Sequence, residues 1–383
     1  MAKRPAAKSK PTPPREIEVR APAAEPMPTP VPFASILGQD MAIARLTEAM
    51  RSGRIHHAWV FHGPAGVGKF TAALAFAALL LDPTTQPGIT GEIVSDPDSP
   101  TRRLLDAGAH PDLHVVTKEL AKFHSDPDVR KLKLTTIPVD VVREFLIAPG
   151  NRAASVAARS LAGKVFIVDE AELMGAAAQN ALLKFLEEPP PRSIVMLVTT
   201  SEEHLLPTIR SRCQRVYFGP LPPDAMNRWL TAAGLQGSSG DMAWLRTFAM
   251  GSPGVAAGAV AAGLPAWRAA LGPMLEDAAA GRYAPALGPT MAELVDAWAK
   301  ARVESGDEGS KSAATRAGAD WMLRLLASHA RDVARRAATR HVAVRWADAL
   351  RDAEAHLDAN LTPLFVFERL ACDLALGESV GAS

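Results

Sequence analysis

The chain carries the sequence Gly63-Pro64-Ala65-Gly66-Val67-Gly68-Lys69-Phe70-Thr71. The spacing is that of a phosphate-binding loop, in which backbone N–H groups surround the phosphates and the lysine reaches the β and γ oxygens. We expect the phosphate contacts to be Gly63, Gly66, Gly68 and Lys69. The next residue of such a loop supplies a hydroxyl to Mg²⁺, but here it is Phe70, whose ring offers no lone pair to a hard cation. The loop therefore predicts a nucleotide-binding scaffold that lacks its metal ligand.

The segments around this loop predict a doubly wound parallel sheet. An apolar strand at 58–62 leads into the loop and an apolar helix at 70–81 follows it, which is the context that the motif requires. Further strands are expected at 113–117, 164–169 and 193–200, and helices at 41–52, 139–147 and 174–187. The stretches 82–112 and 119–136 are polar and rich in turn residues. We expect both to be surface excursions that contribute nothing to the core.

Beyond Pro220 the pattern predicts helices alone. We expect them at 224–233, 241–250, 255–262, 290–302, 313–338, 342–355 and 361–376, with a stretch punctuated by glycine and proline after the third. Six of the seven tryptophans fall in this half. Because they have apolar neighbours at helical spacing, we expect them to form core rather than a binding platform.

Composition excludes several classes of protein. The net charge is +1 over 383 residues, so the molecule as a whole is not built to coat nucleic acid. Two cysteines, Cys213 and Cys372, fit the reducing cytoplasm and exclude a four-cysteine zinc site within one chain. No apolar run has the length of a membrane span.

The Pro/Ala-rich residues 1–32 are expected to be disordered. Six basic and two acidic side chains give residues 1–20 a net charge of +4. Contact of this tail with DNA stays open.

Asp169 and Glu170 follow the expected strand at 164–169. In phosphate-loop ATPases the first of two such carboxylates holds Mg²⁺ and the second polarises the attacking water. The pair comes about a hundred residues after the glycine-rich loop, and a strand ending in Thr199-Thr200 follows it. We therefore interpret Asp169 and Glu170 as the acidic part of the nucleotide site.

Three further segments identify a family. The segments 36–40 (Ile-Leu-Gly-Gln-Asp), 181–190 (Ala-Leu-Leu-Lys-Phe-Leu-Glu-Glu-Pro-Pro) and 206–214 (Leu-Pro-Thr-Ile-Arg-Ser-Arg-Cys-Gln) resemble signatures of the AAA+ clamp loaders of bacterial DNA polymerase III. The resemblance implies that Arg212 acts in trans as an arginine finger, stabilising charge on the phosphate transferred in a neighbouring subunit. It also implies an AAA+ (P-loop) α/β domain with a parallel sheet at 33–220, a small helical lid at 221–265 and an all-α collar at 266–383.

Within the family the chain resembles the stator, or delta-prime, branch more than the ATPase motors. Phe70 removes the metal ligand that motors retain, and Gly254 of the segment Gly251-Ser252-Pro253-Gly254 stands where motors place a nucleotide-sensing arginine. The segments His110-Pro111-Asp112 and Ile137-Pro138-Val139-Asp140, with Arg143, also resemble that branch. The resemblance implies motor (gamma/tau) and delta subunits, the sliding clamp and primed DNA as partners, in the cytoplasm and without a membrane.

Two departures from the family leave alternatives open. Residues 82–112 contain no cysteine, so the zinc module of many relatives is not expected, and His56, His57, His110 and His114 are interpreted as structural or solvated. The persistence of Lys69, Asp169 and Glu170 leaves open whether ATP or ADP binds without hydrolysis. The competing functions are an active motor subunit that tolerates Phe70 and a scaffold in which Arg212 no longer acts. Whether the chain is itself an enzyme also stays open.

Overall fold

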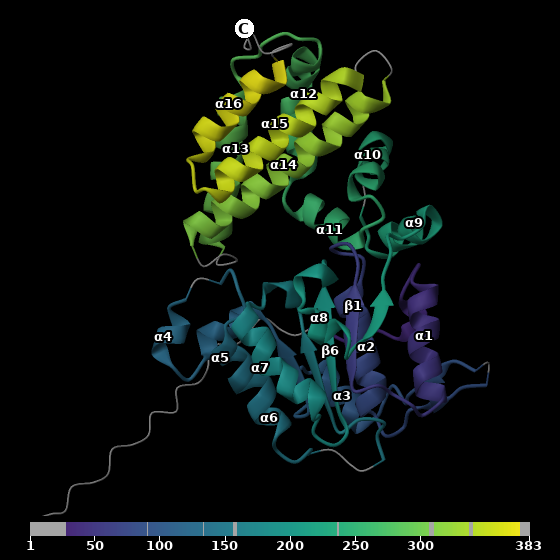
Figure 1. Ribbon diagram of the computed structural model, residues 1–383. Coiled ribbons are helices and arrows are strands. Elements are labelled where there is room, and N and C mark those ends of the chain that lie inside the picture. The colour runs from purple at the N-terminus through teal and green to yellow at the C-terminus, as the bar shows by residue number, and fades with distance from the viewer. Residues whose placement is uncertain are drawn as a thin grey trace, which may run out of the picture.

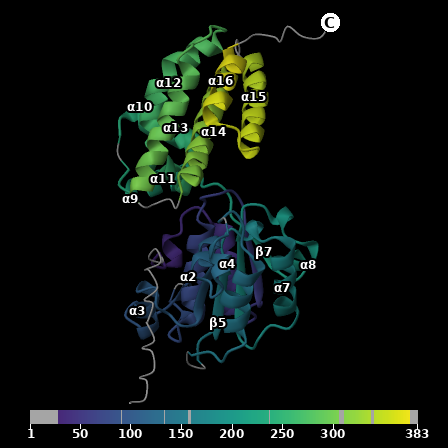
Figure 2. The ribbon, with the colours of Figure 1, turned by 90° about the vertical axis from the view of Figure 1, so that its left-hand side faces the viewer.

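The computed structural model describes residues 28–375 except 90, 133, 156–158, 236, 306–309 and 337–339. The predicted tail therefore lies outside the described residues as far as residue 27. Figures 1 and 2 show two bodies of structure, a sheet with flanking helices at one end and a bundle of long helices at the other, with α11 (Pro253–Ala261) between them.

The sheet has five strands, each parallel to its neighbours. Their order is β4 (Leu113–Val116), β5 (Lys164–Val168), β6 (Ser193–Thr199), β1 (Ala58–His62) and β7 (Gln214–Tyr217). The predicted parallel sheet is confirmed, and four strands lie within one residue of their expected bounds. The fifth, β7, was not predicted, because only Val216 of its four residues is buried and its exposed side chains give no apolar run.

Two hydrophobic layers cover the faces of this sheet, because alternate residues of each strand point to opposite sides. Val165 and Ile167 of β5 pack with α1 (Asp40–Arg51) and α2 (Lys69–Leu81). Phe166 and Val168 pack on the other face with α5 (Val139–Val142) and α7 (Ala176–Glu187). A π-helical turn, η3 (Arg143–Ile147), and α6 (Ala148–Gly150) continue α5.

The two polar excursions contain more structure than the sequence predicts. The first holds the short strands β2 (Gln86–Pro87) and β3 (Ile93–Val94) and the helix α3 (Pro100–Asp106); the second holds η2 (Lys118–Phe123) and α4 (Pro127–Arg130). Leu105, Ile93, Ala121 and Val129 are buried in the layers described above. The prediction that these stretches contribute nothing to the core is therefore wrong. The composition of these stretches indicates their turns. It does not indicate the few apolar side chains that anchor each excursion to the core.

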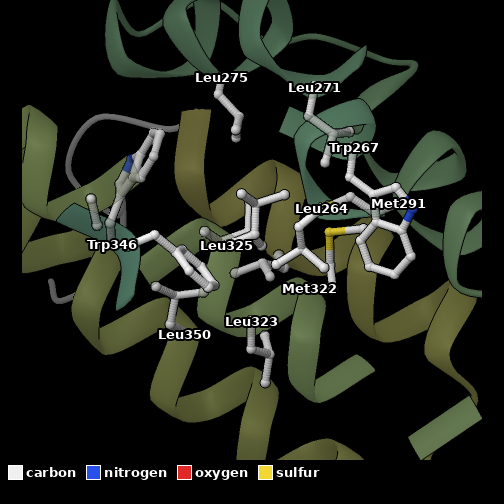
Figure 3. Packing of buried hydrophobic residues seen from close by; sticks show 14 of the residues in the cluster. Leu264, Trp267, Leu271, Leu275, Met291, Met322, Leu323, Leu325, Trp346 and Leu350 are labelled. Carbon is white, nitrogen blue, oxygen red and sulfur yellow. The ribbon is translucent and has the colours of Figure 1, made fainter. Parts of the chain in front are cut away.

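The second half of the chain is helical, as predicted. After α9 (Pro223–Ala232), α10 (Ser239–Ala249) and α11 come α12 (Leu264–Ala279), α13 (Leu287–Glu304), α14 (Lys311–Arg335), α15 (Arg340–Asp358) and α16 (Pro363–Ala375). Helix α12 was not expected, because its sequence contains glycine and proline. Its first proline lies in the opening turn, where no N–H is needed, while Leu264, Trp267 and Leu271 recur at helical spacing and are buried (Figure 3).

One continuous hydrophobic cluster runs through this half, from Leu221 to Ala375. Trp244, Trp267 and Trp346 are buried in it, and Trp229, Trp298 and Trp321 pack against it while partly exposed. The prediction that the tryptophans form core is confirmed for the three buried rings. Among the described residues no single helix is long and apolar enough to cross a membrane. The pair α11 and α12 passes that test together but bends by 79° and lies within this cluster.

Trp346 offers a test of this core. Its ring is fully buried and stacks on His329, and its Nε1–H donates to the carbonyl of Leu374 at 2.9 Å, which ties α15 to α16. Trp346→Phe removes this donor and leaves the carbonyl only the longer hydrogen bond from Nη2 of Arg345 at 3.4 Å, so we expect a loss of about 1 kcal/mol in the free energy of unfolding. Denaturant unfolding measures it. Trp298→Phe, at a partly exposed ring, is the control; an equal loss in both variants would contradict the role assigned to the Leu374 bond.

Candidate functional site

The phosphate-binding loop joins the end of β1 to the start of α2, as predicted. Gly63 has φ +141°, and a Cβ there would lie 2.0 Å from the carbonyl oxygen of Phe218. Gly68 caps α2 in the left-handed region with φ +100°. These conformations require glycine, and they bring the loop against the strand-end backbone at the carboxyl edge of the sheet.

Lys69 lies folded back onto its own loop. Its Nζ donates to the carbonyls of Gly63 at 2.7 Å and Pro64 at 2.6 Å, and the residue is buried. Burial lowers the pKa of Lys69, against the attraction of the Glu172 and Asp169 carboxylates. The ammonium group is thus satisfied by backbone oxygens within the loop, in the conformation that the structure describes.

Asp169 follows β5 and faces the loop across a shared cavity. Burial raises the pKa of Asp169 to about 6, helped by the neighbouring carboxylates of Glu170 and Glu172, while a hydrogen bond from the Glu170 N–H and the charge of Lys69 act in the opposite direction. Near pH 6 this carboxyl is therefore half protonated, which weakens it as a ligand for a cation.

Glu170, interpreted from the sequence as the residue that polarises water, is paired elsewhere. Its backbone has φ +48°, and its carboxylate lies 2.6 Å from Nζ of Lys118, the first residue of η2 after β4. Both side chains are partly exposed, so the pair contributes little stability, but it occupies the carboxylate. No sequence motif points to Lys118; only the adjacency of β4 and β5 brings it to Glu170.

Glu172 is a third carboxylate at the same edge, which the sequence reading missed. Burial raises its pKa, but hydrogen bonds from Thr200 and Thr199 outweigh burial, so the pKa of Glu172 is lowered overall. The N–H and the hydroxyl of Thr200 both donate to its Oε1. The acidic residue three places after Asp169 was the available signal.

The helical half contacts the phosphate-binding loop directly. The hydroxyl of Ser252 donates to the carbonyl of Ala65 at 2.8 Å, and the N–H of Gly254 donates to the carbonyl of Gly66, also at 2.8 Å. A Cβ on Gly254 would lie 2.7 Å from Cα of Gly66. Gly254, the position expected to have lost a sensing arginine, thus packs backbone to backbone on the loop.

Gln39, from the segment 36–40, fixes the loop from a second direction. The side chain is buried, and its amide Nε2 donates to the carbonyl of Val67 at 3.1 Å and to that of Gly219 at 2.8 Å. The sequence reading used this segment only as a family signature. In the structure Gln39 ties the loop to the connection between β7 and the helical half.

These elements enclose a cavity of about 680 Å³. The structure brings most of the predicted nucleotide contacts to its wall, namely Gly66, Gly68, Lys69, Asp169 and Glu170, and Phe70 lies among them. Ile36, Leu37 and Trp229 supply an apolar part of the lining, suited to a flat ring. Gly63 does not line the cavity, but its carbonyl accepts from Lys69.

The donor set lacks the expected Mg²⁺ ligand. Magnesium requires near-octahedral oxygen ligation, but Phe70 presents carbon at the position of that ligand, and Glu170 is paired with Lys118. Other residues that line the cavity and carry side-chain oxygens include Thr71, Asp169, Glu172, Thr199 and Thr200. A nucleotide held here would rest on backbone N–H groups, Lys69 and apolar contacts.

Arg212 lies outside this cavity. It stands between α8 (Pro207–Arg210) and β7, with its side chain 37% exposed. Its Nη2 lies 2.8 Å from Oε1 of Glu187 and its Nη1 donates to the carbonyl of Thr208 at 3.0 Å. The following residue, Cys213, is half-buried, and burial raises the pKa of its thiol to about 12, so it is no nucleophile.

The candidate metal ligands do not assemble into a site. Among the described residues no group of three or more His, Cys, Asp or Glu side chains could hold a metal ion. The rings of His56 and His57 stack on each other, His110 is buried, and His114 stacks on Phe166. These contacts support the structural interpretation of the four histidines.

The parallel sheet, the phosphate-binding loop after β1 and the carboxylates after β5 define an α/β domain of the AAA+ type, joined to helical structure. Residues 38–222 match the family profile described as DNA polymerase III, delta subunit. The DNA polymerase III subunit gamma/tau of Mycobacterium tuberculosis (strain ATCC 25618 / H37Rv) is 36% identical over 205 residues, 52% of this chain and 31% of that protein. The DNA polymerase III subunit delta' of Escherichia coli (strain K12) is 33% identical over 212 residues, 55% and 57% of the two chains.

Over residues 38–222 the chain is thus similar to clamp-loader subunits of DNA polymerase III. The matched region spans between about a third and just over half of the curated relatives named above. These relatives include both delta' and gamma/tau subunits, so they do not separate a stator from a motor. A solved gamma subunit-related protein of Thermotoga maritima is 15% identical over 86% of this chain and 98% of its own, with a TM-score of 0.42, too low to carry an argument.

Asp169 makes stability depend on pH. Because its folded pKa is about 6 and the usual value is 3.8, the folded state binds more protons between these values and stability falls as pH rises through that window. At pH 7.5 we expect the free energy of unfolding of Asp169→Asn to be about 2 kcal/mol higher than that of the wild type. This difference should disappear toward pH 4. Denaturant titrations at several pH values measure this; an equal difference at pH 4.5 and pH 7.5 would contradict it.

Gly254→Ala tests the contact between the helical half and the loop. In a helix this change alone stabilises by up to about 1 kcal/mol, but here the new Cβ meets the backbone of Gly66, which cannot move aside as a side chain can. We expect net destabilisation of about 1–3 kcal/mol and faster hydrogen exchange at the Gly254 amide. Gly240→Ala, in α10 with no atom closer than 3.9 Å to the new Cβ, is the control. If both variants gained stability, the contact would be looser than described.

Proposed function

We propose that the chain is the stator, or delta-prime, subunit of a DNA polymerase III clamp loader. In this role it supports ATP-driven loading of the sliding clamp onto primed DNA and completes the ATP site of a neighbouring motor subunit with Arg212. The observation that carries the proposal is the nucleotide cavity in which Phe70 occupies the position of the metal ligand. The chain's own site is then catalytically silent.

Two contacts support this proposal independently of Phe70. Lys118 pairs with Glu170, so the carboxylate that would polarise water is neutralised. Gly254 packs on Gly66 where a sensing arginine would need space for its side chain. In this proposal the site lacks the metal ligand, a free carboxylate to polarise water and a second cation. It therefore has few groups that could stabilise the charge on a transferred phosphate.

Arg212 is placed to act on a neighbour rather than on its own cavity. Its guanidinium lies at the surface, outside the lining of the cavity, and is held by Glu187 and Thr208. A guanidinium supplied in trans makes hydrolysis depend on correct docking of the two subunits, because the developing charge is stabilised only when they meet.

The rest of the proposed role follows from the family. Residues 33–220 form the AAA+ domain, 221–265 the lid and 266–383 the collar that holds the subunits together. The lid boundary falls just inside α12, and one hydrophobic cluster spans lid and collar. The proposed partners are the motor (gamma/tau) and delta subunits, with the clamp and primed DNA reached through the complex in the cytoplasm. Any DNA contact would follow the phosphate backbone.

A second candidate is an active motor subunit. It is favoured by the 36% identity to gamma/tau relatives and by the persistence of Lys69 and Asp169 at the cavity. ATP turnover by the purified chain distinguishes the two. The stator proposal expects turnover no greater than that of Lys69→Ala; robust hydrolysis that Lys69→Ala abolishes would establish the motor.

Arg212→Ala separates the stator from an inert scaffold. The assay uses a complex reconstituted with motor and delta subunits, clamp and primed DNA. We expect ATP turnover at the neighbouring site to fall about 10³-fold or more. The total ATPase rate of the complex then falls by the fraction that this one site contributes. Arg215→Ala, an exposed arginine on β7, is the matched control and should leave the rate unchanged. Unchanged stimulated ATPase with Arg212→Ala would show that the finger does not act.

A further inference from the structure

The side chain of Arg212 is held in one orientation by two contacts from its own subunit. One is the ion pair with Glu187, Nη2 to Oε1 at 2.8 Å; the other is the hydrogen bond from Nη1 to the carbonyl of Thr208 at 3.0 Å. The first contact comes from α7 and the second from α8, so the guanidinium bridges two helices. An exposed arginine without such contacts would sample many rotamers.

Glu187 is carried by a fixed element. It is the last residue of α7, and Leu182, Phe185 and Leu186 on the same helix are buried against the sheet. The carbonyl of Leu186, one residue away, also lies 3.0 Å from Nε2 of His57. The carboxylate therefore extends from a helix end whose position is set by the core, while the carboxylate itself is half exposed.

The contacts leave most of the guanidinium available. Arginine has five N–H donors in a fixed planar arrangement, and the bonds to Glu187 and Thr208 use one on each terminal nitrogen. A phosphate of a neighbouring nucleotide can accept from the remaining donors without displacing Glu187. The geometry thus indicates that the Glu187 carboxylate orients Arg212 and does not compete with the phosphate for it.

We propose that Glu187 is a positioning residue for Arg212. It fixes the guanidinium across the end of α7 so that the arginine is already ordered when the neighbouring subunit docks. This inference rests on the proposed function, in which Arg212 acts in trans. Glu187 does not line the nucleotide cavity; it acts through Arg212 by reducing the conformational freedom lost at docking.

The test is the ATPase of the reconstituted complex with motor and delta subunits, clamp and primed DNA. We expect Glu187→Ala to lower kcat at the neighbouring site about fivefold, the factor for an exposed ion pair at the upper end of its usual strength, with KM for ATP unchanged. Glu187→Gln, which keeps the shape and an acceptor oxygen, should lose less. Glu188→Gln, the exposed glutamate that follows, is the control and should match the wild type.

A double variant distinguishes positioning from a general structural role. In the Arg212→Ala background, Glu187→Ala should cause no further loss, because there is no guanidinium left to orient. A further fivefold loss in that background would overturn the inference. So would a wild-type kcat for Glu187→Ala in a complex where Arg212→Ala is defective.

Failure of the proposed function gives a different result. If Arg212→Ala itself leaves stimulated ATPase unchanged, the arginine finger is absent and the role of Glu187 falls with it. Thermal unfolding of the purified variants checks the fold, and Glu187→Gln decides the matter if Glu187→Ala does not fold. In that case a wild-type kcat for Glu187→Gln counts against the inference.

Discussion

The hydrogen bond from the N–H of Gly254 to the carbonyl of Gly66 joins the helical half of the molecule to the phosphate-binding loop. It is possible only because neither residue has a side chain: a Cβ on either one would lie within 3.0 Å of the other. The hydroxyl of Ser252 adds a second bond to the loop, and the N–H of Leu221 bonds the carbonyl of Gly251 at 2.7 Å. The apolar side of the cavity, including Trp229, therefore has a position set by backbone contacts rather than by a bound nucleotide.

The acidic edge of the sheet places three carboxylates in three different surroundings. Asp169 has its pKa raised by burial, Glu170 pairs with Lys118, and Glu172 accepts from Thr200. Each carboxylate therefore has its own local partner or environment rather than a common one.

The sequence predicts the elements that bury continuous apolar runs. The strands β1, β5 and β6 and the helix α2 lie within one residue of expectation, because glycine fixes the loop and the flanking runs allow no other register. It misses β7, an edge strand with exposed side chains, and α12, whose prolines suggested a break.

The candidate site follows the same division. Its residues along the loop and after β5 are predictable because a motif spaces them along the chain. The pairs Lys118–Glu170 and Gly66–Gly254 are not predictable, because each depends on which elements become neighbours in space. The contacts of Arg212 are likewise not predictable from the sequence. Glu187 lies in a segment that resembles a family signature, but nothing in that segment indicates an ion pair with Arg212.

The pair between Lys118 and Glu170 has a consequence for how such a site could change over generations. A hydroxyl gained at residue 70 would still face a carboxylate neutralised by Lys118, and an arginine gained at residue 254 would have to lift the helical half off Gly66. In the proposed stator, either reversion alone would leave the other contact in place, so restoring a motor site would take more than one change.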